Sequence, residues 1–364
     1  MRRHPVVLFL CAHFSTLLAG ASPCAAAPGG PLIRLSFPGG DLRAYIAPLH
    51  GADLAGLQVR RGGSWSELLY RGMNYRPTGG WTGKASILWP AVGRNFPNAA
   101  GAGRAAGELG WVLQGRVYPI PLHGFARDQA WRIVGRGSCD GSSFLTLALR
   151  DNARTRGMYP FGFTLTTEYR IWRQALYIRQ TVRASRANAM PMPFSIGNHI
   201  TFRIPLLPGD DLRRTAISTP AAEQVITDAS GRPTGRVVKA VGFAHARVLS
   251  SLKPLTPISL SGYAAGQEWV RLEEGSGFAV VVSHTEERQP KDTPVLFNLW
   301  GDAARGYFAP EPWVGKQDSL ATGDGTISLP PGDAFHWMIE VRVAAEAAAG
   351  AMPRAAASAP TCLQ

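Results

Sequence analysis

The chain has 364 residues, of which 45% are hydrophobic and 17% are charged, and its formal net charge is +13. This composition supplies ample apolar material for a packed core and excludes a disordered, highly charged chain. Stretches with helical periodicity are scarce, whereas 41 glycines and 28 prolines provide many turns. The sequence therefore predicts short strands joined by turns.

The first residues have the features of an export signal. Arg2 and Arg3 precede a mainly apolar stretch over residues 6–18, and Ala19-Gly20-Ala21 offers a small-residue cleavage site. We expect residues 1–21 to be removed as a signal peptide and the mature protein to be periplasmic or secreted. Neither this apolar stretch nor any later one is long enough to span a membrane.

Two alternatives stay open at this end of the chain. Cleavage could instead follow residue 26, and Cys24 could carry a lipid, although Ala21-Ser22-Pro23 before it makes a poor lipoprotein signal. Export also permits a disulfide, but the sequence does not decide whether Cys139 is paired.

Basic side chains are spread along the whole chain. Without residues 1–21, which contain two arginines and no acidic residue, the net charge is +11. A nucleic-acid-binding protein is expected to gather such charge in a basic helix, arm or patch, and the sequence shows no such element. We therefore predict no nucleic-acid partner.

Strand-like runs follow one another along most of the chain, without an internal repeat or a linker between domains. Their bounds are 32–37, 42–46, 57–60, 65–70, 115–118, 131–135, 144–150, 163–172, 176–184, 193–202, 269–272, 278–283, 295–299, 326–329 and 335–343. Residues 206–237 are predicted to be irregular, with a turn at 231–235. The expected fold is all-β, one large antiparallel sandwich or barrel over residues 32–343. The alanine-rich residues 344–364 are expected to form a disordered tail.

One carboxylate stands out for its setting. Glu311 lies between Pro310 and Pro312 and beside Trp313. The prolines exclude a helix and favour an extended backbone. Aromatic neighbours would remove water from the carboxylate and raise its pKa, as a general base that works near neutral pH requires. A solvated glutamate in a proline-bounded loop is the alternative interpretation.

Two histidines and an arginine also lie in apolar or proline-rich segments. They are His123, His199 and Arg94. Each histidine taken alone is more typical of a structural role. Together with Glu311, however, they supply a proton donor, a proton acceptor and a cation suited to chemistry at neutral pH.

With these segments the sequence resembles the aldose 1-epimerase (galactose mutarotase) family. The segments occur in the family's order, and they are Gly93-Arg94-Asn95, Leu122-His123-Gly124-Phe125-Ala126-Arg127 followed by Trp131, Tyr159-Pro160-Phe161, Met192-Pro193-Phe194-Ser195-Ile196-Gly197-Asn198-His199, Gly231-Arg232-Pro233-Thr234-Gly235 and Pro310-Glu311-Pro312-Trp313-Val314-Gly315. The resemblance implies a large antiparallel β-sandwich, in agreement with the strand pattern. It also implies an isomerase that interconverts the α and β anomers of a free aldohexose without a cofactor or a metal.

The resemblance further implies a role for each candidate residue. Glu311 would be the general base that takes the proton from the C1 hydroxyl, and His199 the general acid that protonates the ring oxygen. His123 and Arg94 would bind sugar hydroxyls or steady the developing charge, and Trp313 would line the pocket. The partner would be a small-molecule sugar, and the oligomeric state is not predicted.

The sequence departs from the family at two places. The segment 263–269 lacks an aspartate that some members use to bind sugar hydroxyls, with Gln267 and Glu268 as weak substitutes, and the segment 93–98 lacks a second arginine. Two other functions therefore stay open. One is a hexose-6-phosphate 1-epimerase that grips phosphate with Arg94 and Arg127. The other is a sugar-binding sandwich without catalysis.

Overall fold

The computed structural model describes residues 31–70, 83–97, 109–139, 141–286 and 295–344. Within these ranges helices are short: α1 (Ala153–Arg156), α2 (Ser319–Thr322) and four 3₁₀ turns at Ala126–Asp128, Leu212–Arg214, Leu249–Ser251 and Ala303–Arg305. No described helix is long and apolar enough to cross a membrane. The predicted signal peptide and most of the predicted tail lie outside the described residues.

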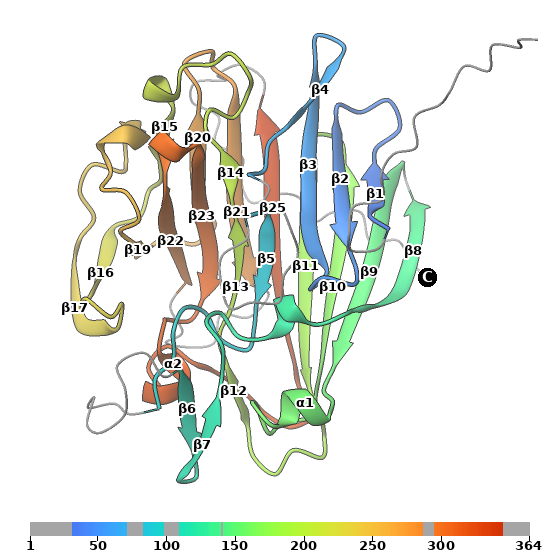
Figure 1. Ribbon diagram of the computed structural model, residues 1–364, viewed down its shortest axis with the longest axis vertical. Helices are drawn as coiled ribbons and strands as arrows, with labels where there is room; N and C mark the ends of the chain where they lie inside the picture. Colours follow the sequence, from blue (N-terminus) through green and yellow to red (C-terminus); the bar gives the residue numbers. More distant parts are fainter. Residues whose placement is uncertain (1–30, 71–82, 98–108, 140, 287–294, 345–364) are drawn as a thin grey trace, which may run out of the picture.

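The rest of the fold consists of antiparallel strands in two layers (Figure 1). One layer is a nine-stranded sheet. In spatial order it contains β18 (Arg247–Val248), β15 (Ala216–Ser218), β20 (Trp269–Glu273), β21 (Ala279–Glu286), β25 (Ala334–Ala344), β11 (Ala175–Ala184), β10 (Phe163–Trp172), β9 (Ser142–Arg150) and β8 (Arg132–Cys139).

The other layer contains an eight-stranded and a four-stranded sheet. The eight-stranded sheet runs β17 (Pro233–Lys239), β16 (Glu223–Thr227), β19 (Ile258–Ser261), β22 (Val295–Asp302), β23 (Tyr307–Val314), β13 (Ile196–Ile200) and β5 (Ala85–Leu88), with β14 (Phe202–Arg203) also paired to β23. The four-stranded sheet runs β1 (Ile33–Ser36), β2 (Leu42–Ala47), β3 (Asp53–Arg61) and β4 (Ser64–Glu67). Two small pairs complete the fold: β6 (Gly110–Leu113) with β7 (Arg116–Pro119), and β12 (Met192–Phe194) with β24 (Ile327–Leu329).

The core lies between the two layers. Along β10, for example, every second residue from Phe163 to Tyr169 is buried, whereas Thr164, Thr166 and Glu168 between them are only partly buried. This is the period of two expected for a strand with one face in the core. Figure 1 shows β1, β2 and β3 in front of β9, β10 and β11. The predicted antiparallel β-sandwich is confirmed.

The prediction of an irregular segment at 206–237 is wrong in part. That segment includes β15, β16 and the start of β17. The predicted turn at 231–235 is displaced, because β17 already begins at Pro233. β17 is an edge strand whose residues are nearly all exposed, so it shows no alternation of apolar and polar residues from which a strand can be recognised.

The segment around Glu311 is not a loop but the central, fully buried strand β23. Proline is rare in such strands because it has no N–H to donate. Here β23 pairs continuously with β22 on one edge. On its other edge it pairs with β13 as far as Gly197 and with β14 from Phe202 onward. Pro310 and Pro312 fall in the interval between, where no backbone pairing to β13 is required.

Candidate active site

The two predicted catalytic residues, His199 and Glu311, lie in the gap where β23 has no backbone pairing to β13. Gly197 lies opposite Trp313 on one side of it, and Phe202 lies opposite Phe308 on the other. Continuing this register through the interval places His199 directly opposite Glu311. Cross-strand neighbours project to the same face of a sheet, and His199 Nε2 lies 3.6 Å from Glu311 Oε1.

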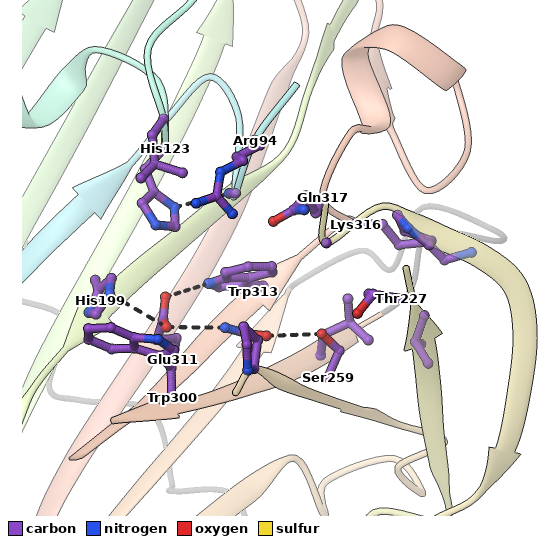
Figure 2. Close-up of a pocket in the computed structure, with 18 residues that line it drawn as sticks. Arg94, His123, His199, Thr227, Ser259, Trp300, Glu311, Trp313, Lys316 and Gln317 are labelled. Carbon is purple, nitrogen blue, oxygen red and sulfur yellow. Dashed lines mark hydrogen bonds and ion pairs between the residues drawn. The ribbon is translucent and has the colours of Figure 1, made fainter. Parts of the chain in front are cut away.

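The row of polar side chains continues across the next two strands. Glu311 pairs with Asn298 of β22, and Asn298 pairs with Ser259 of β19. Ser259 Oγ donates a 2.9 Å hydrogen bond to Asn298 Oδ1, and Asn298 Nδ2 donates one of 3.2 Å to Glu311 Oε1. The serine therefore fixes the orientation of the amide, so that its N–H faces the carboxyl group. In Figure 2 this row of hydrogen bonds appears as dashed lines between Ser259 and Glu311.

The second oxygen of Glu311 is bound by the indole of Trp313, whose Nε1 donates to Oε2 at 3.2 Å. Room for this indole depends on Gly197 on the neighbouring strand. A Cβ added there would lie 2.6 Å from Trp313 Cδ1 and 2.9 Å from a methyl group of Val92, closer than packed atoms allow. Trp313, predicted to line the pocket, does so and in addition holds the carboxyl group.

His199 is oriented from its other ring nitrogen. Thr201 Oγ1 donates to the His199 carbonyl oxygen at 3.1 Å and lies 3.1 Å from His199 Nδ1. Because the single hydroxyl proton is used toward the carbonyl, Nδ1–H is the donor of the second contact. Nε2 of the neutral ring then presents its lone pair to Glu311.

Burial changes the protonation of this pair. It raises the pKa of Glu311 to about 8, opposed by the hydrogen bonds from Asn298 and Trp313. Burial, and after it the positive charge of Arg127, lowers the pKa of His199 to about 3. The 3.6 Å separation is within ion-pair range, but burial disfavours both charges. At neutral pH the pair therefore holds one transferable proton besides His199 Nδ1–H, and the neutral acid and the neutral imidazole are the favoured forms. The raised pKa predicted for Glu311 is confirmed.

His123 enters the site from a loop. Its backbone has φ of 65°, and it is tied to Gly93 by two hydrogen bonds, from His123 N to Gly93 O at 2.9 Å and from Gly93 N to His123 Nδ1 at 3.0 Å. Burial, followed by the charge of His199, lowers the pKa of His123 well below its usual value. The neutral ring accepts at Nδ1 and so carries its proton on Nε2.

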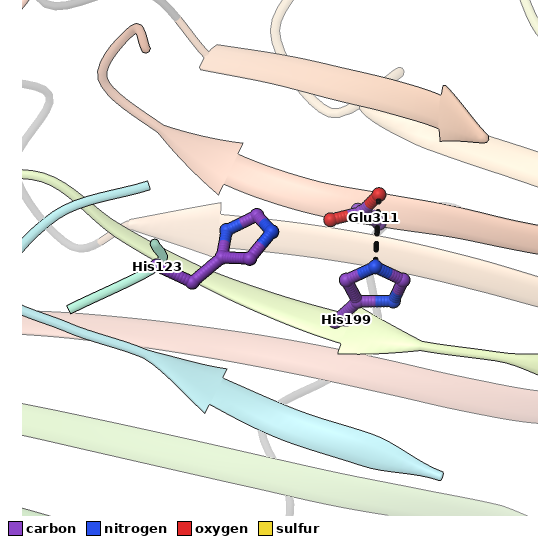
Figure 3. Close-up of side chains that lie close together, drawn as sticks. All are labelled: His123, His199 and Glu311. Atoms are coloured by element: carbon purple, nitrogen blue, oxygen red, sulfur yellow. Dashed lines mark ion pairs between the residues drawn. The ribbon is translucent and has the colours of Figure 1, made fainter. Parts of the chain in front are cut away.

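His123, His199 and Glu311 converge, with one polar atom from each within 4.8 Å of the others (Figure 3). Such a group could bind a metal ion. The proton on His123 Nε2 argues otherwise, because that nitrogen is then a hydrogen-bond donor rather than a ligand. The donor set suits oxygen atoms of an uncharged ligand, and the expectation of no metal remains a prediction.

The three side chains lie in a cavity of about 170 Å³. The lining residues are Gly93, Arg94, Leu122, His123, His199, Val225, Thr227, Gly231, Pro233, Pro257, Ser259, Leu296, Asn298, Trp300, Glu311, Trp313, Lys316 and Gln317. The hairpin β16–β17 forms one wall, and Arg232 holds it in place through a 3.0 Å ion pair with Asp318. Arg94 lies exposed at the rim.

All five predicted site residues line this cavity, whereas Gln267, Glu268 and Arg127 are not among its lining residues. Sequence reasoning missed Ser259, Asn298, Thr201 and Gln317. A signal for Asn298 was present, because it is a single amide within the apolar run 295–300. Ser259 and Thr201 carry no such signal, since small hydroxyl side chains are common in strands.

The region between residues 102 and 251 matches the family model for aldose 1-epimerase. The resemblance to that family is confirmed. The match includes His123 and His199 and covers less than half of the chain. A Salmonella typhimurium protein whose name proposes a glucose-6-phosphate 1-epimerase is 27% identical over 92 residues, which are 24% of this chain and 31% of that protein.

Solved structures have the same fold. A Synechocystis protein superimposes with a TM-score of 0.70 at 23% identity, covering 88% of this chain and 99% of the other. A galactose mutarotase-related enzyme from Lactobacillus acidophilus gives 0.66 at 19%, covering 87% and 99%. The galactose 1-epimerase of Lactobacillus acidophilus gives 0.61 at 13%, covering 84% and 92%.

The raised pKa of Glu311 makes a prediction about stability. An unfolded glutamate ionises near pH 4.5, whereas the folded Glu311 stays protonated up to about pH 8. The stability of the wild type is therefore progressively lost as pH rises from 4.5 to 8. Glu311→Gln has no such group. From pH 4.5 to 8 the difference in free energy of unfolding between Glu311→Gln and wild type should therefore change in favour of the variant, by on the order of a few kcal/mol.

Urea denaturation at pH 4.5, 6 and 8 measures this difference. The matched control is Glu273→Gln, which removes a partly exposed glutamate of β20 outside the cavity, and the pH dependence of Glu311→Gln is compared with it. A difference between Glu311→Gln and wild type that stays constant from pH 4.5 to 8 would show that Glu311 is not kept protonated by burial.

Proposed function

We propose that this protein is an aldose 1-epimerase that interconverts the anomers of a free aldohexose by acid/base opening and closing of the ring. The observation that carries the proposal is the cross-strand pair of Glu311 and His199, buried at the floor of a cavity and 3.6 Å apart. Ring opening removes a proton from one sugar oxygen and delivers one to its neighbour. A pair that holds one transferable proton can do both without exchange with solvent.

The catalytic steps follow from the contacts. Entry of the sugar brings polar hydroxyls to the pair, and a proton shift from Glu311 to His199 produces the carboxylate and the imidazolium. N–H groups of Asn298 and Trp313 stabilise the carboxylate, and the hydroxyl oxygen of Thr201 accepts from the imidazolium. Glu311 then takes the proton of the C1 hydroxyl while His199 protonates the ring oxygen, and the C1–O5 bond breaks.

Ring closure reverses these steps after rotation about C1–C2. His199 takes back the proton from the C5 hydroxyl as its oxygen attacks C1, and Glu311 returns a proton to the oxygen at C1. The pair ends with the single proton with which it began. Trp300 and Trp313 offer flat apolar surfaces for the sugar ring, and His123 Nε2–H and Arg94 would donate to its oxygens.

A phosphorylated aldose is the second candidate substrate. It is favoured by two basic side chains in the lining, Arg94 and Lys316, and by the name of the Salmonella relative. Lys316 is bound by both carboxyl oxygens of Asp324 at 2.9 Å, however, and Arg127 does not line the cavity. A single exposed arginine is a weak phosphate site, so the free sugar is the better-supported substrate.

Polarimetry tests the proposed activity on freshly dissolved α-D-glucose, α-D-galactose and α-D-glucose 6-phosphate. Wild type should accelerate equilibration, and Glu311→Gln and His199→Asn should each lose roughly 10²-fold or more, the usual contribution of a general acid or base. His336→Asn on the outer side of β25 is the control and should keep full activity. A wild type that accelerates none of these sugars would contradict the proposal, and acceleration of the phosphate alone would select the second candidate.

We also propose that the protein is exported. The support comes from the signal-like residues 1–21 and from Cys139 at the end of β8, which is disulfide-bonded. The three other cysteines, Cys11, Cys24 and Cys362, lie outside the described residues. Stable disulfides are typical of oxidising compartments and rare in the cytosol.

Fractionation of expressing cells, followed by mass spectrometry of the intact protein, tests export. The expected product is periplasmic or secreted, begins after residue 21 or 26, and resists alkylation at Cys139 until a reductant is added. A cytosolic protein that retains Met1 and has a reactive Cys139 thiol would contradict this localisation.

A further inference from the structure

Gln317 lies in the loop between β23 and α2 and lines the cavity. Figure 2 shows its amide directed into the cavity, on the other side of Trp313 from Glu311. Neither the acid/base pair nor the hydrogen-bonded row behind it uses this side chain. The proposed proton transfers therefore assign no function to Gln317 or to the part of the cavity around it.

The amide of Gln317 sits between two glycines. A Cβ on Gly93 would overlap its Oε1, and a Cβ on Gly231 would overlap its Nε2. These glycines have φ of 62° and 90°, values that side-chain-bearing residues rarely adopt. Two loops far apart in the sequence thus leave a slot that the glutamine amide occupies.

The loop that carries Gln317 is anchored immediately beyond it. The backbone N–H of Asp318 donates to Arg94 O at 2.9 Å, and its carboxylate accepts from Phe96 N at 2.9 Å and from Arg232 Nε at 3.0 Å. These bonds tie the loop both to the segment of Gly93 and to the hairpin of Gly231. The glutamine is therefore held in position before any ligand binds, which reduces the entropic cost of recognition.

The amide nitrogen of Gln317 is buried, and no hydrogen-bond partner for it is found among the described residues. An unsatisfied buried donor is costly, and a small rotation of the amide that turns this N–H toward a ligand oxygen in the cavity would remove that cost. Its neighbour Lys316 is already bound to Asp324, and the lining contains one acidic side chain, Glu311. The slot thus offers a neutral N–H donor beside a lysine that is already engaged, which suits a hydroxyl better than an anion.

We propose that Gln317 determines sugar specificity by hydrogen bonding a hydroxyl of the substrate away from C1. The inference rests on the proposed sugar substrate. It assigns recognition to the loop after β23 and proton transfer to β23 and β13, so the two tasks can be changed separately.

The test compares wild type with Gln317→Leu and Gln317→Glu in two measurements. Calorimetry measures the Kd of 1,5-anhydro-D-glucitol, which has no anomeric hydroxyl and cannot react. Polarimetry measures kcat/KM for D-glucose, its 3-, 4- and 6-deoxy analogues and D-xylose. Gln174→Leu, an exposed position between β10 and β11, is the matched control.

Gln317→Leu should weaken binding of the anhydro sugar about 10- to 100-fold and raise KM while the pH dependence of kcat is unchanged. For one of the deoxy sugars, wild type should have a kcat/KM well below its value for glucose. Gln317→Leu should have the same kcat/KM for that deoxy sugar as for glucose. Gln317→Glu keeps the shape but loses the N–H groups, so it should show the same loss of discrimination. Gln174→Leu should behave as wild type.

Folded variants that bind and discriminate as wild type does would overturn the inference. So would a loss seen only with glucose 6-phosphate, since Gln317 would then serve an anion. If wild type binds the anhydro sugar through Gln317 but catalyses no mutarotation, the proposed function fails and the recognition role stands. If wild type neither binds nor converts these sugars, both are refuted.

Discussion

Two prolines in the middle of a buried strand create the conditions on which this site depends. Pro310 and Pro312 cannot donate hydrogen bonds toward β13, and along that edge the pairing is interrupted without a shift in register. Glu311 and His199 therefore face each other as cross-strand neighbours. They come from strands more than 100 residues apart in sequence, and rigid sheet geometry rather than a loop sets their separation.

Burial of an acid and a base so close together is costly, and the surrounding contacts limit the cost. Each carboxyl oxygen of Glu311 receives one N–H donor, and Asn298 is itself held by Ser259. Thr201 occupies the far nitrogen of His199. The remaining freedom of the pair is the position of one proton, which is the freedom that ring opening requires. The supporting contacts thus orient the pair without fixing its charge state.

The sequence predicted the sandwich, because alternating apolar residues mark most strands of the two layers. It also grouped Arg94, His123, His199 and Glu311 by their apolar or proline-rich settings. The family resemblance then implied a role for each of them and for Trp313. It did not predict β16 and β17, because an exposed edge hairpin has no buried face to leave a pattern. Nor did it predict the polar row, since Ser259, Asn298 and Glu311 become neighbours only through strand register, a relationship between distant segments.

The pH dependence of kcat/KM tests most directly whether the pair works with one shared proton. Mutarotation of the preferred aldose would be followed from pH 5 to 10, with the uncatalysed rate subtracted at each pH. Since the pair keeps its single proton between pKa values of about 3 and about 8, we expect a plateau up to about pH 8 and a fall approaching tenfold per pH unit above it. Activity that rises through pH 6–7 as a lone histidine titrates, or that continues to rise beyond pH 9, would contradict the shared proton.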